Sequence, residues 1–406
     1  MSAEAFAHAA PHQGESTRVA PVSISLGVRA LFGLMIAIGA VTFFLEVRTD
    51  PTRAYASWLH NYFVFLCLAL GGTFFTALHH MVGATWSVVV RRVAEAFSSF
   101  LPVAFLLFLV VLVGVPNLYV WSGSGAVQGA EANLIVKGGY LSFNLFAVRN
   151  LIYLAIWIFF SWYFVRNSTK QDDSRDPSLS KTSLKLAPVF LLTFALTFTL
   201  ASFDLLMSLE PTWYSTIFGV YCWAGLWQSG LAGITIVTIL LRRQGALEGV
   251  VSRAHYHDLG KYLFAFAVFW TYIAFSQLML IWYANLPEEI EWMIHRIYTG
   301  WGAIGIATGV LKFVVPFFVL MHQKMKENET VLLTVAAGIV IGEWLDIYWI
   351  VYPAFSPERA VLSWNEIGVT LGFLGLFGWT VQTFLSRHPV APHGDPAFQS
   401  SVRFHG

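Results

Sequence analysis

Charge is scarce in this chain. Only 12% of its 406 residues are Asp, Glu, Lys or Arg, whereas 57% are hydrophobic. Soluble domains are about a quarter charged, so a chain with so little charge cannot cover a water-facing surface of this size. Lipid is therefore the expected solvent for most of the surface, and the composition predicts a membrane protein.

Patterns that hold metals or nucleic acid are also missing. The two cysteines, Cys67 and Cys222, lie in apolar segments without CxxC or zinc spacing, and the net charge of +1 gives no basic excess for nucleic acid. No apolar segment carries a pair of histidines near its middle, as a membrane haem requires. We expect this chain to bind no metal or cofactor, so its role in any redox system would be quinol binding, proton transfer or scaffolding.

Ten apolar segments are long enough to cross a bilayer core of about 30 Å, which takes about 20 helical residues. The predicted fold class is all-α and polytopic, with about ten transmembrane helices. The segments are 24–47, 58–83, 97–115, 146–165, 186–207, 214–241, 262–284, 292–321, 330–352 and 366–384.

The loops alternate in positive charge, which predicts the orientation. One set of loops contains Arg18 in the N-terminal tail 1–23, Arg91 and Arg92, and the basic loop 166–185 that divides spans 1–4 (24–165) from spans 5–10 (186–385). It also contains the Lys and Arg residues of 242–261, Lys324, Lys326 and those of the tail 386–406. The alternate loops, including the long glycine-rich loop of about 116–145, hold few Lys and Arg residues. The positive-inside rule predicts that both termini are cytoplasmic.

Three sets of polar residues stand out, because ionisable groups inside a bilayer are expensive and often functional. The first is Lys312 in the eighth segment with Glu343 and Asp346 in the ninth, extended by Tyr272 and Gln277 in the seventh. Such a line of groups suits a proton relay. A buried ion pair that locks two helices together explains the same residues.

The second set lies at the outer ends of the first-half segments and contains His60, Arg149, Asn150, Asp204 and Glu210. A carboxylate and an imidazole near one face suit the two protons of a quinol. The alternative is a rim network that pairs Arg149 with Asp204 or Glu210.

The third set lies at the inner end of the second segment. It contains His79, His80 and Glu95 with Arg91 and Arg92. This set suits a mouth for proton uptake from the cytoplasm. The favoured alternative is that these residues form a solvated or lipid-headgroup anchor.

Three stretches carry a more specific pattern. Residues 204–216 read DLLMSLEPTWYST, and this run resembles the D-x-x-M-S-L-E-P-x-W-x-S-T signature of the NrfD/PsrC-like membrane subunits of alternative complex III. Residues 257–261 (HDLGK), 269–272 (FWTY), 275–277 (FSQ) and 281–289 (IWYANLPEE) agree with that family. So do residues 137–141 (KGGYL) with Arg149.

Two types of such subunit occur in the complex, ActC and ActF. Residues 79–92, HHMVGATWSVVVRR, and the chain length resemble the ActF type. The resemblance implies two four-helix bundles, spans 2–5 and 6–9, with one flanking helix at each end. It also implies a place in the inner membrane of a bacterium.

The resemblance further implies the chemistry and the partners. The complex oxidises menaquinol or another quinol and passes electrons to iron–sulfur clusters and haem c on other subunits. The partners are the sister subunit ActC, the iron–sulfur subunit ActB, multihaem cytochrome c subunits, small membrane subunits and a haem-copper oxidase. In this family the quinol site is assigned to ActC, and Thr212 stands where many relatives carry histidine.

The function expected from this resemblance is support of proton translocation coupled to quinol oxidation, together with scaffolding of the sister subunit. A purely structural scaffold and a stand-alone secondary transporter are the alternatives. Transporters usually show broken helices in paired repeats. Pro316 and the glycines of the eighth segment allow one break, and the first half shows no matching signal.

Overall fold

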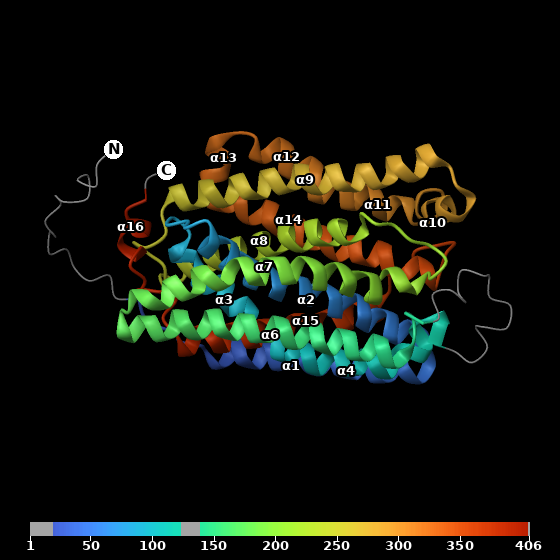
Figure 1. The fold of residues 1–406 in the computed structure, drawn as a ribbon, viewed down its shortest axis with the longest axis horizontal. Helices are drawn as coiled ribbons and strands as arrows, with labels where there is room; N and C mark the ends of the chain where they lie inside the picture. Colours follow the sequence, from blue (N-terminus) through green and yellow to red (C-terminus); the bar gives the residue numbers. More distant parts are fainter. Residues whose placement is uncertain (1–18, 123–138, 405–406) are drawn as a thin grey trace, which may run out of the picture.

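The structure is a computed structural model that describes residues 19–122 and 139–404. Most of the predicted N-terminal tail and the middle of the predicted loop 116–145, including Lys137, lie outside the described residues. Within them the all-α polytopic prediction is confirmed, because there is no β-strand and ten helical segments are long and apolar enough to cross a membrane. Both ends of the described chain lie at the same end of the molecule, here called the terminal end (Figure 1).

The crossing helices follow the predicted order. They are α1 (Leu26–Thr49), α2 (Pro51–Met81), α3 (Val88–Ser98) continued by α4 (Leu101–Leu118), α6 (Phe143–Ser174), α7 (Pro177–Leu205), α8 (Phe218–Arg243), α9 (Arg253–Ala284), α11 (Gly302–Gly309) continued by α12 (Val315–Leu320), α14 (Glu329–Val351) and α15 (Trp364–Arg387). Short elements connect them: η1 (Val120–Ser122), η2 (Met207–Leu209), α10 (Pro287–Ile297), the π-turn η3 (Val310–Val314), α13 (Gln323–Glu327), η4 (Tyr352–Ala354) and α16 (Phe398–Val402).

Local sequence explains several helix starts. Asp50 and Asp176 cap α2 and α7 with their carboxylates, and each precedes a proline at the first helical position, where the missing N–H costs nothing. Asn328 caps α14 in the same way. Ser363 and Glu366 form a reciprocal capping box at the start of α15.

Helices α2 and α8 form the centre of the molecule. In the most apolar 18-residue stretch of each helix, 89% of the residues are buried in α2 and 83% in α8. The corresponding shares are 22% in α1 and 28% in α9. The two helices meet at Gly71 and Gly230, where a Cβ on Gly71 would lie 2.8 Å from the Cα of Gly230. Glycine at both positions lets the two backbones touch.

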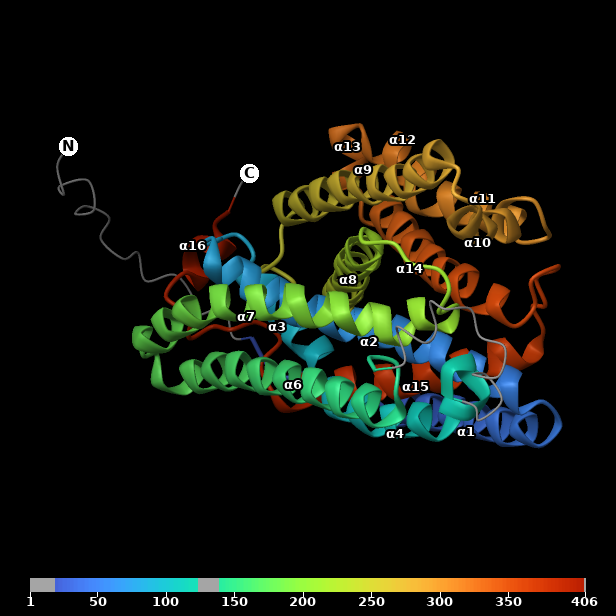
Figure 2. The ribbon, with the colours of Figure 1, turned by 45° about the vertical axis from the view of Figure 1, so that its right-hand side comes forward.

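Other helices pack around this pair in two groups. Helices α3, α4 and α7 pack on α2, and α6 packs on α4 and α7; helices α9 and α14 pack on α8, and α11 and α12 pack on α14 and α9 (Figure 2). Helices α1 and α15, the first and the last, lie against each other. Their closest point is Gly39 against Gly372.

The eighth predicted segment, 292–321, is wrong at its start. Residues from Trp292 to Ile297 belong to the separate short helix α10, and the crossing helix begins at Gly302. The seventh, 262–284, begins nine residues too late, since α9 starts at Arg253. The third segment is interrupted at Ser99 and Phe100, between α3 and α4.

The tail after α15 is packed rather than free. Val390 and Ala391 are fully buried, and Phe398 is 3% exposed. Helix α16 lies against α3 at the terminal end. This segment therefore closes the bundle on the side where positive charges are most frequent.

Candidate functional site

Lys312 lies in the π-turn η3, halfway along the eighth crossing helix. Pro316 has no N–H, so it cannot donate to the carbonyl of Lys312 four residues earlier. The side chain of Gln228 on α8 donates to that carbonyl instead, at 2.7 Å. A π-turn inside an α-helix is rare and frequently marks a functional position, and here it carries the one lysine of this helix.

The structure brings together the three charged residues of the first predicted set. The Nζ of Lys312 donates to Glu343 Oε2 at 2.5 Å and to Asp346 Oδ2 at 2.7 Å. The three residues are 0%, 1% and 2% exposed, respectively. We call Lys312, Glu343 and Asp346 the lysine cluster.

Two aromatic residues that the sequence reading missed complete the surroundings of Asp346. The hydroxyl of Tyr221 donates to Asp346 Oδ1, and Trp270 Nε1 donates to Asp346 Oδ2 at 3.1 Å. The ammonium of Lys312 also lies 4.2 Å from the centre of the Trp270 ring, within cation–π range. With aromatics at 16% of the chain, nothing in the sequence linked either residue to Asp346, although Trp270 belongs to the quoted run 269–272.

Glu343 is held less completely than Asp346. Its Oε1 is buried and accepts no hydrogen bond from any of the described residues. Gly225 on α8 faces this carboxylate so closely that an added Cβ would lie 2.7 Å from both oxygens. Glycine is therefore needed at 225 for Glu343 to keep its place.

The balance of charge in the cluster favours proton exchange. One ammonium faces two carboxylates, so full ionisation would leave a net negative charge buried in the bundle. Uncompensated buried charge is costly, and one proton shared between the two carboxylates would make the cluster neutral. A single proton can then move between Glu343 and Asp346 without a change in net charge.

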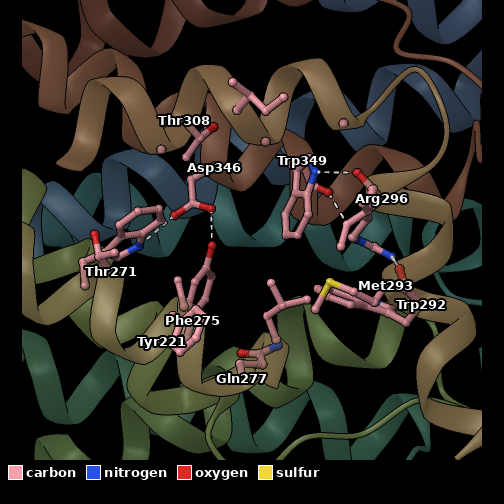
Figure 3. A pocket seen from close by; sticks show the side chains of 18 residues that line it. Tyr221, Thr271, Phe275, Gln277, Trp292, Met293, Arg296, Thr308, Asp346 and Trp349 are labelled. Carbon is pink, nitrogen blue, oxygen red and sulfur yellow. Dashed lines mark hydrogen bonds between the residues drawn. The ribbon is translucent and has the colours of Figure 1, made fainter. Parts of the chain in front are cut away.

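A cavity of about 400 Å³ lies beside Asp346 between α9, α10, α11 and α14 (Figure 3). Gln277, which was predicted to extend the line, is in its wall and 4% exposed. Thr308 and Arg296 line the same cavity. Tyr272 does not join them, because its side chain is 62% exposed on the outer face of α9.

The second predicted set separates into three parts. Arg149 donates two hydrogen bonds to Asp204, at 2.8 and 3.1 Å, and Asn150 donates a third at 3.2 Å. Glu210 pairs instead with Arg296 of α10, at 2.6 Å. Arg149 and Asp204 thus form the rim pair that the sequence reading offered as an alternative.

His60 does not lie with Arg149 or Asp204. It is fully buried ten residues into α2, and its Nε2 is 2.8 Å from the backbone carbonyl of Trp344 on α14. The rings of Trp344, Tyr348 and Tyr352 surround it. His60 therefore joins the first half to the second, a role that its place in the sequence did not indicate.

The third set is buried rather than solvated, which contradicts the anchor interpretation. Arg91 and Arg92 are 4% and 0% exposed. Arg91 pairs with Asp395 of the C-terminal segment at 2.6 Å, whereas Arg92 pairs with Glu95 at 2.8 Å and with Asp172 of α6. The C-terminal segment thus covers the surface that was expected to face water or headgroups.

His79 and His80 lie beside this ionic network. Each has a buried Nε2 that makes no hydrogen bond with residues 19–122 or 139–404. The Nδ1 of His79 is 2.8 Å from the carbonyl of Phe75, one turn earlier on α2. Neither imidazole is in the ion pairs of Arg91 and Arg92.

Asp395 lies outside the crossing helices, and its charge state is set by two opposing effects. Burial alone would raise the pKa of this carboxyl. The Arg91 guanidinium and the backbone N–H of Ala397 favour the ionised form more strongly, so the pKa is lowered from its ordinary value of 3.8. Asp395 is thus a carboxylate wherever the protein is folded near neutral pH.

A further charged group was not singled out from the sequence. Arg53 of α2 lies 2.8 Å from Glu366 of α15 and 3.5 Å from Glu46 of α1. Both carboxylates are buried. This group joins the first, second and last crossing helices at the end opposite the termini.

In residues 19–122 and 139–404, no group of three or more His, Cys, Asp or Glu side chains is arranged to hold a metal ion. Comparison with models of protein families finds no match to the chain, and comparison with curated protein sequences finds none either.

Proposed function

We propose that this chain is a membrane subunit of a bacterial respiratory quinol oxidoreductase of the alternative complex III type, in which it moves protons while partner subunits carry electrons. The observation that carries the proton-moving part is the lysine cluster, two carboxylates on one ammonium in the middle of the crossing helices. The place in a quinol-oxidising complex is supported by the sequence motifs at 204–216 and 257–289.

The cluster has the surroundings that a relay needs. Asp346 borders a cavity, and Glu343 has a carboxylate oxygen that accepts no hydrogen bond within the described part of the chain. A proton received at one carboxylate can pass to the other, since Lys312 contacts both.

The test of the relay is Glu343→Gln in the complex purified and reconstituted into vesicles. We expect normal assembly and quinol oxidation with a proton-to-electron ratio that falls at least severalfold, because a neutral amide cannot exchange a proton with Asp346. Glu358→Gln, an exposed position at the opposite end, is the matched control. An unchanged ratio in Glu343→Gln would refute the relay.

A structural scaffold is the second candidate, and one observation favours it. Lys312 is tied to α14 by two short ion pairs, so the cluster also fixes the eighth crossing helix to the ninth. Loss of one partner from a buried pair costs about 3–5 kcal/mol. If the cluster is only a lock, Glu343→Gln will reduce the yield of assembled complex, with no change in the ratio of the remainder.

The proposed partners are tested by purification. A C-terminal tag, mild detergent extraction and mass spectrometry should recover a multihaem cytochrome c, an iron–sulfur protein and a second NrfD-like membrane subunit. Recovery of the chain alone would refute the respiratory assignment and favour a transporter.

A further inference from the structure

The cavity beside Asp346 opens toward the surface that crosses the membrane. Phe275, Ile297 and Ile306 line it and are 59%, 40% and 72% exposed, respectively. Since these apolar side chains lie on crossing or interfacial helices, lipid is the medium they meet. A molecule that enters here comes from the bilayer rather than from water.

The inner wall of the cavity carries polar atoms that the protein leaves unsatisfied. Gln277 Oε1 on α9 and Thr308 Oγ1 on α11 are buried and have no hydrogen-bond partner in the described residues. Figure 3 shows them on opposite walls, with Thr308 next to Asp346. A buried polar group without a partner costs about 1–3 kcal/mol, so a bound molecule that satisfies both atoms gains that amount.

The chemistry of these atoms selects the ligand. Gln277 Oε1 only accepts hydrogen bonds, and Thr308 Oγ1 on the opposite wall can accept one as well. The remaining wall is largely aromatic, with Trp270, Trp292 and Trp349. Flat rings stack favourably against such walls. The site therefore suits a ring that donates hydrogen bonds and is otherwise apolar.

We propose that this cavity binds the head of a membrane-soluble hydroxylated aromatic ring, the chemical class of a quinol, with one hydroxyl donating to Gln277. The volume of about 400 Å³ is in the range of small-molecule sites and large enough for one or two fused rings. The site lies in the second bundle, away from Arg149 and Asp204. A link between this ligand and proton movement rests on the proposed function, whereas binding itself does not.

Binding is measured on the full-length chain in lipid nanodiscs with a fluorescent alkyl hydroxyquinoline N-oxide, a quinol mimic whose emission is quenched when it binds. We expect saturable binding of one probe per chain. Gly309 lines the cavity, and an added Cβ there meets no atom within 4 Å. Gly309→Phe should therefore fill the cavity and weaken binding at least tenfold.

The matched control is Gly27→Phe on α1, where an added Cβ also meets nothing within 4 Å. It should bind like the wild type. Gln277→Leu removes the acceptor with little change in volume and provides the second variant if Gly309→Phe does not fold. It should weaken binding of the hydroxylated probe about tenfold and leave binding of an O-methylated analogue unchanged.

Three outcomes would overturn the proposal. One is binding of the probe that neither Gly309→Phe nor Gln277→Leu weakens. Another is loss of binding in Asp204→Asn alone, which would place the ligand at the first-bundle rim. The third is no saturable binding to a folded chain, which would leave the cavity to water or lipid tails. All three outcomes are measured by probe binding and not by proton or electron transfer. The binding proposal can therefore fail independently of the proton relay.

Discussion

At the scale of single residues, charge in an apolar setting was the signal that could be read without a structure. Lys312, Glu343 and Asp346 stood out because ionisable side chains are rare in crossing segments, and they do meet. Their neutral partners could not be found in that way. Tyr221, Trp270 and Gln228 are ordinary residues of an aromatic-rich bundle until packing aims them at the cluster.

Gly225 gives a sharp test of how the cluster is held. A methyl group at this position would lie 2.7 Å from both oxygens of Glu343, so Gly225→Ala must move the carboxylate or the helix. Overpacking of this kind costs about 1–3 kcal/mol. We expect a lower thermal unfolding midpoint in detergent together with impaired proton movement.

The control for Gly225 is Gly338→Ala on α14. There the nearest atom to an added Cβ is Leu311 Cδ2 at 3.7 Å, an ordinary contact. This variant should unfold at or slightly above the wild-type midpoint, because alanine favours the helix over glycine. Equal behaviour of the two variants would mean that Gly225 does not position Glu343.

Asp395 gives a pH-dependent prediction. Its pKa is lower in the folded protein than the ordinary 3.8, so its pairing with Arg91 stabilises the fold fully above that value. The contribution is lost as the pH falls through the lower folded value. Asp395→Asn should destabilise the protein by about 1–3 kcal/mol near neutral pH.

The measurement compares the unfolding midpoints of wild type and Asp395→Asn across pH. The gap between them should close as the pH falls below 3.8 and through the lower folded pKa, where the wild-type carboxyl also becomes neutral. Glu358→Asn, at an exposed position, controls for the loss of a surface carboxylate. A gap that stays constant with pH would show that the charge of Asp395 is not what stabilises this segment.

At the scale of elements, hydrophobic runs predicted that each crossing helix exists but not how it begins or how it is interrupted. The segment 292–321 read as one helix because Trp292, Met293 and Ile294 are apolar, yet these residues form α10. Pro316 and the glycines indicated that the eighth segment can break, but not that the break is a π-turn at Lys312. It depends on Pro316 together with a donor from α8, Gln228, that lies 84 positions away.

Helices α1 and α15 provide an element-scale prediction. They touch at Gly39, where an added Cβ would lie 2.3 Å from the Cα of Gly372. Gly39→Ala must separate the two helices and should lower the unfolding midpoint, at a cost of about 1–3 kcal/mol. Gly33→Ala on the same helix is the control, since its nearest contact is Trp379 at 3.9 Å.

If Gly39→Ala and Gly33→Ala unfold alike, the contact between the first and last crossing helices does not contribute to stability. The position of this pair also explains a limit of the sequence reading. Nothing in two segments more than 300 residues apart indicates that they pack together, because each is apolar on all sides and gives no preferred face.

At the scale of the whole molecule, the even number of crossings and the alternation of positive loops were sufficient to predict that both termini share one side. The structure shows the two ends of the described chain at one end of the bundle (Figure 1). Which side of the membrane that end faces stays a prediction from the positive-inside rule. The orientation of the protein in the membrane decides the direction in which the lysine cluster would pass protons.

The orientation is tested with single cysteines, because the native Cys67 and Cys222 are buried and should not react. Glu248 is exposed between α8 and α9 at the terminal end, and Glu288 is exposed at the opposite end. In intact cells a membrane-impermeant maleimide should label Glu288→Cys and spare Glu248→Cys until the cells are opened. The reverse pattern would invert the orientation, so that the cavity beside Asp346, which lies toward the Glu288 end, would serve uptake of protons from the cytoplasm rather than their release.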